Sequence, residues 1–90
     1  MNNVFFEIDS DLYINVNHVV YVDFTDDDDN LGDSLLTISL SNGSELSFTL
    51  FELFEDDFYF NKILKFLEYL RLFDLVLLVS SKVHDLLLNK

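Results

Sequence analysis

The chain has 90 residues, a length that suits one domain with one modest core, and half of its residues are hydrophobic. It contains no cysteine, which excludes disulfides, thiolate metal sites and a cysteine nucleophile. Its formal net charge is −12, from 17 acidic and 5 basic residues, and this disfavours direct binding to nucleic acid.

The sequence predicts neither a secretion signal nor a transmembrane segment. Its first residues lack the basic start and the apolar core of a signal peptide. The longest uninterrupted apolar run, Leu75 to Val79, is too short to cross a bilayer. We therefore expect a cytoplasmic protein in which residues 1–90 form a single acidic domain, without a membrane partner.

Residues 3–50 alternate between apolar and polar positions, which is typical of half-buried strands. Turn-forming residues at 9–11, 17–18, 25–34 and 41–44 separate the strands of an antiparallel meander. We expect the inner face of this sheet to carry Val20, Val22, Phe24, Leu36, Ile38, Leu40, Leu46, Phe48 and Leu50. The outer face would then carry Phe5, Glu7, Val19, Tyr21, Asp23, Thr37, Ser39, Glu45, Ser47 and Thr49.

The Ser-Asn-Gly-Ser sequence after Leu40 predicts a hairpin, and the alternation on either side decides its loop length. A two-residue loop would place Leu40 opposite Glu45 and mix the two faces of the sheet. A three-residue loop, 41–43, places Ile38 opposite Leu46. It also puts Gly43 at the position that needs a left-handed backbone, so we expect the three-residue loop.

From about residue 50 the apolar period becomes helical. Thr49 and Glu52 match a capping box, and the helix that follows should bury Leu64 against Phe48. A second helix is expected after an N-cap at Asp74, although residues 75–79 alone also fit a short buried strand. The predicted fold class is therefore α+β, with an antiparallel meander and two C-terminal helices packed on one of its faces.

No catalytic, metal or cofactor site is predicted. The Asp-rich loop fails the calcium-binding EF-hand pattern, because Leu31 and Thr37 replace the required Gly and Glu, which leaves only weak divalent binding open. The two histidines, His18 and His84, are scattered and are expected to be surface or capping residues. No glycine-flanked serine marks a nucleophile, so we expect no enzymatic activity.

The acidic residues are the candidate partner-binding groups, because residues 1–61 contain fourteen acids and no Lys or Arg. Solubility alone would also favour net charge, and it is the simplest alternative explanation. The candidate contacts form a loop group and a group near the first helix: Asp23, Asp26, Asp27, Asp28, Asp29 and Asp33 in the first, and Glu45, Glu52, Glu55 and Asp56 in the second.

Two function classes fit this pattern. In the first, the protein mimics nucleic acid and blocks the basic groove of a nucleic-acid-binding enzyme such as a nuclease, like the inhibitors that phages direct against restriction or CRISPR enzymes. In the second, it is a structural or adaptor domain that forms a homodimer or binds another protein through its surplus Phe and Leu. Salt separates the two, because it weakens the first kind of binding and not the second.

Overall fold

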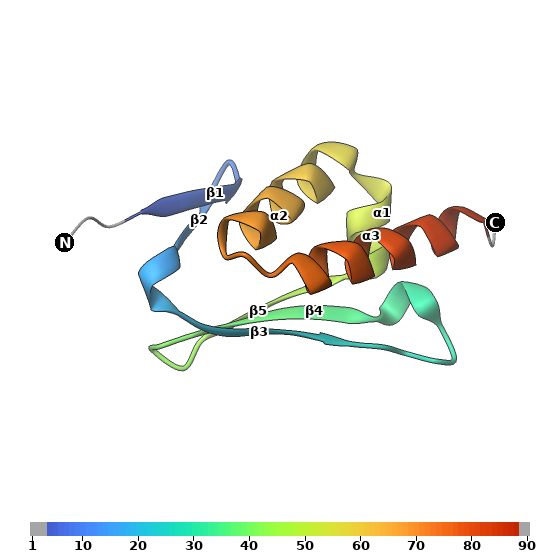
Figure 1. Ribbon diagram of the computed structural model, residues 1–90, viewed down its shortest axis with the longest axis horizontal. Coiled ribbons are helices and arrows are strands. Elements are labelled where there is room, and N and C mark those ends of the chain that lie inside the picture. Colours follow the sequence, from blue (N-terminus) through green and yellow to red (C-terminus); the bar gives the residue numbers. More distant parts are fainter. Residues whose placement is uncertain (1–3, 89–90) are drawn as a thin grey trace.

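The computed structural model describes residues 4–88, in which alternating segments form two antiparallel sheets and the helical segments pack above one of them (Figure 1). The strands are β1 (Phe5–Asp9), β2 (Leu12–Asn15), β3 (Val19–Thr25), β4 (Leu35–Leu40) and β5 (Glu45–Thr49). The helices are α1 (Leu50–Glu55), α2 (Asp57–Tyr69) and α3 (Phe73–Leu88), with short 3-10 turns η1 (Val16–His18) and η2 (Leu31–Asp33). The predicted α+β class is confirmed.

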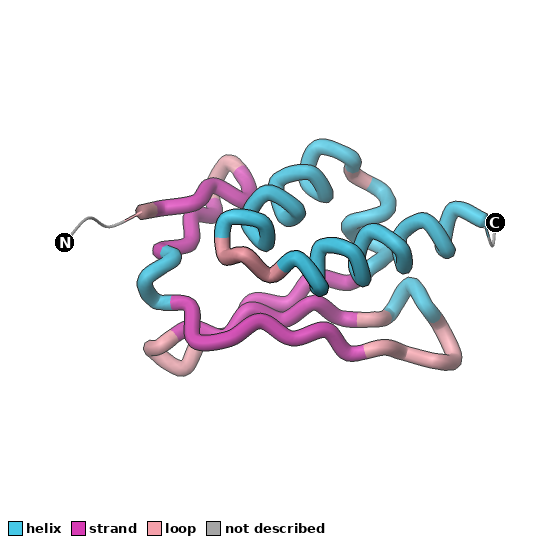
Figure 2. The backbone as a smooth tube through the Cα atoms, in the orientation of Figure 1, coloured by secondary structure: helices cyan, strands magenta, loops and turns pink. Residues whose placement is uncertain are grey.

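The meander is divided into two sheets, not joined as one. Strands β1 and β2 form a separate hairpin, and β3, β4 and β5 form the larger sheet in that order. The division falls at η1, where the Asn15 side chain accepts a hydrogen bond of 3.0 Å from the Asn17 backbone N–H and so caps a turn between the strands. Figure 2 shows the β1–β2 hairpin beside the helices and the larger sheet beneath them.

A bulge in β3 changes which residues face the helices. Val19 pairs with Leu40 and Tyr21 pairs with Ser39, so Val20 has no partner on β4. This extra residue shifts the alternation by one position. Val19 packs against the core and Val20 is exposed, so the inward placement predicted for Val20 and the outward placement predicted for Val19 were both wrong.

The hairpin between β4 and β5 confirms the predicted register. Ile38 lies opposite Leu46 and Leu36 lies opposite Phe48. The Gly43 N–H donates to the Leu40 carbonyl at 3.0 Å, and Gly43 has φ +90°. The three-residue loop therefore relies on a left-handed residue at its last position.

The first predicted helix is two helices. The capping box is present: Thr49 accepts from the Glu52 N–H while Glu52 accepts from the Thr49 N–H. Asp56 then takes an extended conformation, which ends α1, and its side chain caps α2. Helix α2 ends in a Schellman motif, in which the Leu72 N–H donates to the Leu67 carbonyl.

That motif needs a left-handed residue after the helix, and Arg71 supplies it with φ 61°. Helix α3 begins at Phe73, so Asp74 lies in its first turn and is not the N-cap that the sequence predicted. An acid in the first turn of a helix complements the helix dipole, so Asp74 is favourable here although it is not the N-cap. Residues 75–79 are helical, as predicted.

Helix α2 has apolar contacts on two sides. Ile63, Phe66 and Leu67 are fully buried in the core with the inner face of the larger sheet. On its other side α2 meets β1, where the rings of Phe6 and Phe66 lie edge to face at 5.5 Å. Leu64 is only half-buried, so Ile63 takes the core position that the sequence assigned to Leu64.

The outer face of the larger sheet is covered by no other element of residues 4–88 (Figure 1). Hydroxyl groups run across it: Thr37 and Ser47 are linked at 3.3 Å, and Ser39 donates to Glu45 at 3.3 Å. Among the described residues, no helix combines the length and the apolar character that crossing a membrane would require.

Candidate functional site

The acids at the junction of α1 and α2 surround an open pocket of about 570 Å³ between this junction and the end of β1. Four carboxylates and two aromatic rings form most of its wall. The lining residues are Ile8, Asp9, Glu52, Glu55, Asp56, Phe58 and Tyr59. We call this the acidic pocket.

Backbone groups fix two of these carboxylates through one oxygen each. Glu52 Oε1 accepts from the backbone N–H and the hydroxyl of Thr49, both at 3.0 Å. Asp56 Oδ1 accepts from the Tyr59 N–H at 3.1 Å. A carboxylate has a second oxygen with its own lone pairs, and for both residues that oxygen makes no hydrogen bond to another group of residues 4–88. The helix caps therefore also hold acceptors in place at the pocket.

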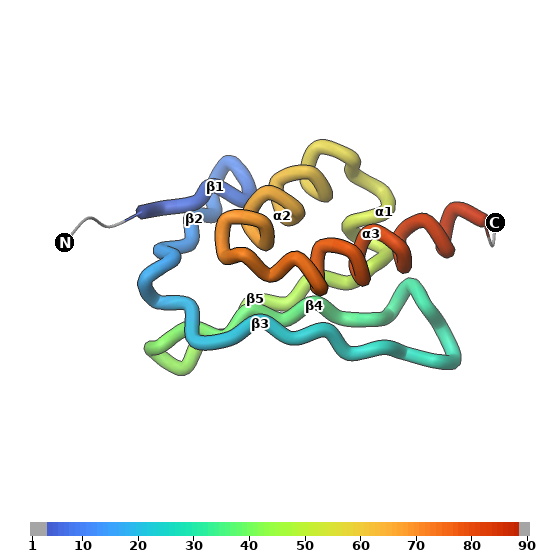
Figure 3. Tube along the Cα trace, viewed as in Figure 1, coloured from blue at the N-terminus to red at the C-terminus, as the bar shows by residue number. Residues whose placement is uncertain are grey.

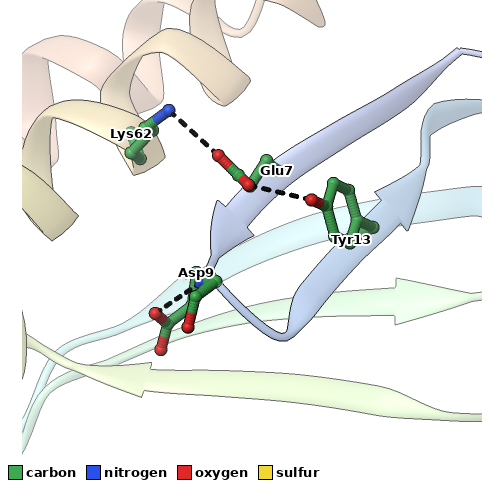
Figure 4. A network of polar contacts seen from close by, with 5 residues as sticks. Glu7, Asp9, Tyr13 and Lys62 are labelled. Atoms are coloured by element: carbon green, nitrogen blue, oxygen red, sulfur yellow. Dashed lines mark hydrogen bonds and ion pairs between the residues drawn. The ribbon is translucent and has the colours of Figure 1, made fainter.

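Asp9 supplies a third acceptor from a different part of the chain. Its Oδ1 accepts from the Ser10 N–H at 2.7 Å at the tip of the β1–β2 hairpin (Figure 4). This hairpin reaches the helix junction because β1 packs along α2. Sequence reasoning did not select Asp9, since nothing local indicates that residue 9 meets residues 52–56.

Tyr59 lies among these acids, and burial and their negative charges both contribute to its raised pKa. Its ring packs edge to face on Phe48 at 5.6 Å between centroids. Burial, and then the negative charges of Glu52, Asp9 and Asp56, raise the pKa of Tyr59 to about 12. Burial disfavours charge of either sign, but the three carboxylates favour a positive one, such as the ammonium of Lys or the guanidinium of Arg.

The second group of acids lies on the loop between β3 and β4, and its own hydrogen bonds shape it. Asp27 Oδ1 accepts from the backbone N–H groups of Asp29 and Asn30, each at 3.0 Å. The Asn30 side chain caps η2 and donates to Asp33 Oδ2 at 3.1 Å. Asp27 therefore has a structural role in the loop, while Asp28 projects its exposed carboxylate without such a bond.

Two ion pairs connect the acidic part of the chain to the helices. Lys62 lies 3.6 Å from Glu7, which also accepts from the Tyr13 hydroxyl at 2.9 Å (Figure 4). Lys82 of α3 lies 3.5 Å from Asp26, at the end of the molecule where the β3–β4 loop and the C-terminal part of α3 meet (Figure 3). These pairs are partly exposed, so each contributes only about 0.2–1 kcal/mol.

The structure places the predicted contact residues at four separate positions. Glu52, Glu55 and Asp56 meet at the acidic pocket, and Asp26, Asp27, Asp28, Asp29 and Asp33 share the β3–β4 loop. Glu45 is not with the pocket acids, because it lies at the opposite end of β5, next to the hairpin. Asp23 lies on the outer face of the larger sheet, opposite Thr37.

Within residues 4–88, no three potential metal ligands among His and carboxylate side chains converge on one point. The acidic pocket offers fixed negative charge and aromatic surface, and these features suit the binding of a cationic side chain. Comparison of the chain with protein-family models, curated proteins and solved structures finds no match.

Proposed function

We propose that this chain is a non-enzymatic inhibitor that occupies the basic, nucleic-acid-binding groove of a partner protein. One observation carries the proposal: residues 1–56 hold thirteen acidic residues and no basic one, whereas residues 57–88 hold four of each. Like charge at this density opposes folding through self-repulsion, so its concentration in one part of the chain favours a use in recognition over solubility alone.

The shape of the molecule supports the same proposal. Its extents are 46 × 24 × 24 Å, so its formal charge of −12 corresponds to about one net charge per 4 Å of the long axis. One strand of duplex DNA carries a phosphate charge about every 3.4 Å. A groove lined with Lys and Arg to fit a nucleic-acid strand would meet a comparable density of negative charge here.

The acidic pocket gives this general attraction a specific contact. Three of its carboxylates are held by backbone hydrogen bonds before any partner arrives, so little side-chain freedom is lost on binding. The Phe58 ring is exposed at the pocket and already lies 5.4 Å from the Lys62 ammonium. A Lys or Arg of the partner would find the same two features there, carboxylate oxygens and an aromatic face.

The test captures partners from host lysate on the immobilised chain at about 50 mM and about 500 mM salt, and then elutes them with duplex DNA. Salt should weaken capture strongly, and DNA should compete with the chain for the partner. Conversion of Asp26, Asp28 and Asp29 to Asn removes three charges but keeps the Asp27 bonds of the loop. This variant should bind the partner more weakly while its circular dichroism is unchanged.

A matched control removes three charges from the balanced part of the chain, with Glu68→Gln, Asp74→Asn and Asp85→Asn. It should bind nearly as well as the wild type, because these residues lie outside the acidic segment. The adaptor alternative expects the reverse pattern. There, capture ignores salt and the Asn substitutions, and Ala at the exposed Phe5 or Tyr21 abolishes it; that result would exclude nucleic-acid mimicry.

A further inference from the structure

Helix α3 has an apolar surface that faces away from the core. Its inner face buries Val79 completely, and Leu75, Val76, Val83 and Leu86 pack against the core beside it. On the other side Phe73, Leu77, Leu87 and Leu88 are 56%, 70%, 56% and 68% exposed. The inner face accounts for the folding of α3, so these outer residues need another explanation.

The outer residues follow the spacing of helices that pack against other helices. Positions 73, 77, 80, 84 and 87 recur at intervals of four and three, which is the pattern of a heptad seam. In α3 they are Phe73, Leu77, Ser80, His84 and Leu87, and Leu88 lies next to them on the same side. We call this the outer seam. Its two ends are large and apolar, and its middle is small and polar.

The outer seam is comparable in area with the largest apolar patch on a typical monomer, about 300–600 Å², and such patches are often functional. Its apolar part consists of one Phe and three Leu side chains, each more than half exposed. A stable interface needs about 800 Å² from each partner. A groove of about 490 Å³ runs beside the seam; Phe54, Phe60 and Val83 add apolar surface to it, and Asp57 adds one carboxylate.

Charge decides which occupant fits. The seam lies in residues 57–88, which are balanced in formal charge, whereas residues 1–56 carry −13. A basic partner would be drawn to the acidic part and away from this seam. A second copy of the chain has the same distribution of charge. Two such molecules repel each other except where both present residues 57–88, whose formal charges balance.

We infer that the outer seam of α3 is the interface of a homodimer in which two α3 helices pack antiparallel about a twofold axis near Ser80 and Ser81. In this arrangement the two serines lie at the crossing point and allow the helices to approach closely. Phe73 of each copy then meets Leu88 of the other, and Leu77 meets His84. The twofold symmetry makes each contact occur twice, as an isologous interface requires.

This inference is independent of the proposed function, because it concerns a different surface and predicts the opposite response to salt. Dimerisation joins two like-charged molecules, so added salt should strengthen it by screening their repulsion. Binding of a basic partner should weaken under the same conditions.

Sedimentation equilibrium of the full chain tests the dimer. At about 100 µM and moderate salt, the wild type should show a mass near twice 10.6 kDa. Leu77→Glu should give the monomer mass, with the dissociation constant raised roughly 100-fold, since one substitution changes both halves of the interface. Leu77 is mostly exposed within one chain, so circular dichroism should show an intact fold, and Leu77→Ser tests the same contact without added charge.

Val20→Glu is the matched control, because Val20 is equally apolar and 62% exposed but lies on the bulge of β3. It should leave the dimer unchanged. A wild-type mass that stays at 10.6 kDa up to about 1 mM, which corresponds to a binding free energy weaker than about −4 kcal/mol, overturns the inference. Equal loss of dimer in Val20→Glu and Leu77→Glu also overturns it.

Single cysteines test the antiparallel arrangement, since the chain has none of its own. Ser81→Cys places the thiol near the axis and should form an interchain disulfide rapidly under mild oxidation. Phe73→Cys should not crosslink alone in an antiparallel pair, whereas in a parallel pair it would. Ser44→Cys, exposed at the β4–β5 hairpin, measures random collision, and crosslinking at a similar rate to Ser81→Cys contradicts the assigned interface.

Discussion

Gly43 shows how one residue fixes the register of a sheet. Its φ of +90° lets the hairpin close in three residues, and that length keeps Ile38 opposite Leu46 and the apolar residues on one face. A Cβ at this position would meet no atom within 4 Å, so the need for glycine comes from the backbone alone and not from crowding.

Replacing Gly43 with Val should therefore destabilise the protein by about 1–3 kcal/mol through backbone strain. Gly43→Asn should cost less, because Asn tolerates the left-handed region better than a β-branched residue does. Urea denaturation followed by circular dichroism measures both. Equal costs for Val and Asn would show that strain at φ +90° is not the cause.

Tyr59 gives the acidic pocket a measurable signature in alkaline solution. Its pKa is about 12 in the folded protein, above the ordinary tyrosine value of 10.0. The folded state thus keeps this proton longer than the unfolded state does. The free energy of unfolding therefore keeps its full value below pH 10 and falls as the pH rises toward 12.

Titration of tyrosinate absorbance should show one group ionising near pH 12, and Tyr59→Phe should remove that step. Glu52→Gln should lower the pKa of Tyr59 only in part, because burial is the larger cause. Tyr13 also has a raised pKa, owing first to its hydrogen bond with Glu7, so Tyr13→Phe is the control that separates the two groups. A titration curve that is unchanged in Tyr59→Phe would contradict this assignment.

At the scale of elements, α2 is the helix on which both sheets depend. It meets β5 through Tyr59 on Phe48 and β1 through Phe66 on Phe6, while Ile63 and Leu67 are buried in the shared core. Leu64, one position along from Ile63, points to a half-buried site. The helical period alone could not separate these neighbours, because both lie within the broad apolar surface of a helix that is covered on two sides.

Ile63→Ala should therefore destabilise the protein by about 2–5 kcal/mol, and Leu64→Ala by clearly less. Phe48→Ala, which removes the partner ring of Tyr59, should cost about 3–5 kcal/mol. Thermal or chemical unfolding of the three variants measures this order. A larger loss for Leu64→Ala than for Ile63→Ala would mean that α2 is rotated from the orientation described.

The elements that sequence reasoning predicted correctly are those in which local chemistry decides the outcome. The capping box at Thr49 and the glycine turn at Gly43 depend on residues within a few positions of each other. The bulge at Val20 was missed because it depends on the pairing of β3 with β4, a distant segment. The break of the helix at Asp56 was missed although its cap on the Tyr59 N–H is local, because the apolar helical period continues across it. Distance along the chain also hid Asp9, which joins the acidic pocket only through the packing of β1 on α2.

At the scale of the whole molecule, uneven charge should make stability depend on salt. Thirteen acids within residues 1–56 repel one another, and within residues 4–88 the ion pairs of Lys62 and Lys82 are the ones that relieve this repulsion directly. Salt screens charges that are more than about 10 Å apart at 0.1 M. The repulsion that opposes folding should therefore fall as salt is added.

The free energy of unfolding should rise by on the order of 1 kcal/mol between low and moderate salt, or about 4–8 °C in Tm for a domain of this size. A variant with Asp28→Asn and Asp29→Asn, which keeps the ion pair of Asp26 with Lys82, should be more stable than the wild type at low salt, and the difference should shrink as salt rises. Differential scanning calorimetry below the alkaline range measures both. Stability that falls with salt would mean that the ion pairs outweigh the repulsion.

The position of α2 and α3 after the sheet in the chain has a consequence for synthesis. The inner face of the larger sheet is covered only when these helices pack on it, yet its strands leave the ribosome first. At a synthesis rate of about 5–20 residues per second, the strands stay uncovered for several seconds. Exposed apolar strands invite aggregation in that interval. We expect the negative charge of residues 1–56, which no Lys or Arg offsets, to keep neighbouring nascent chains apart until Ile63, Phe66 and Leu67 are synthesised.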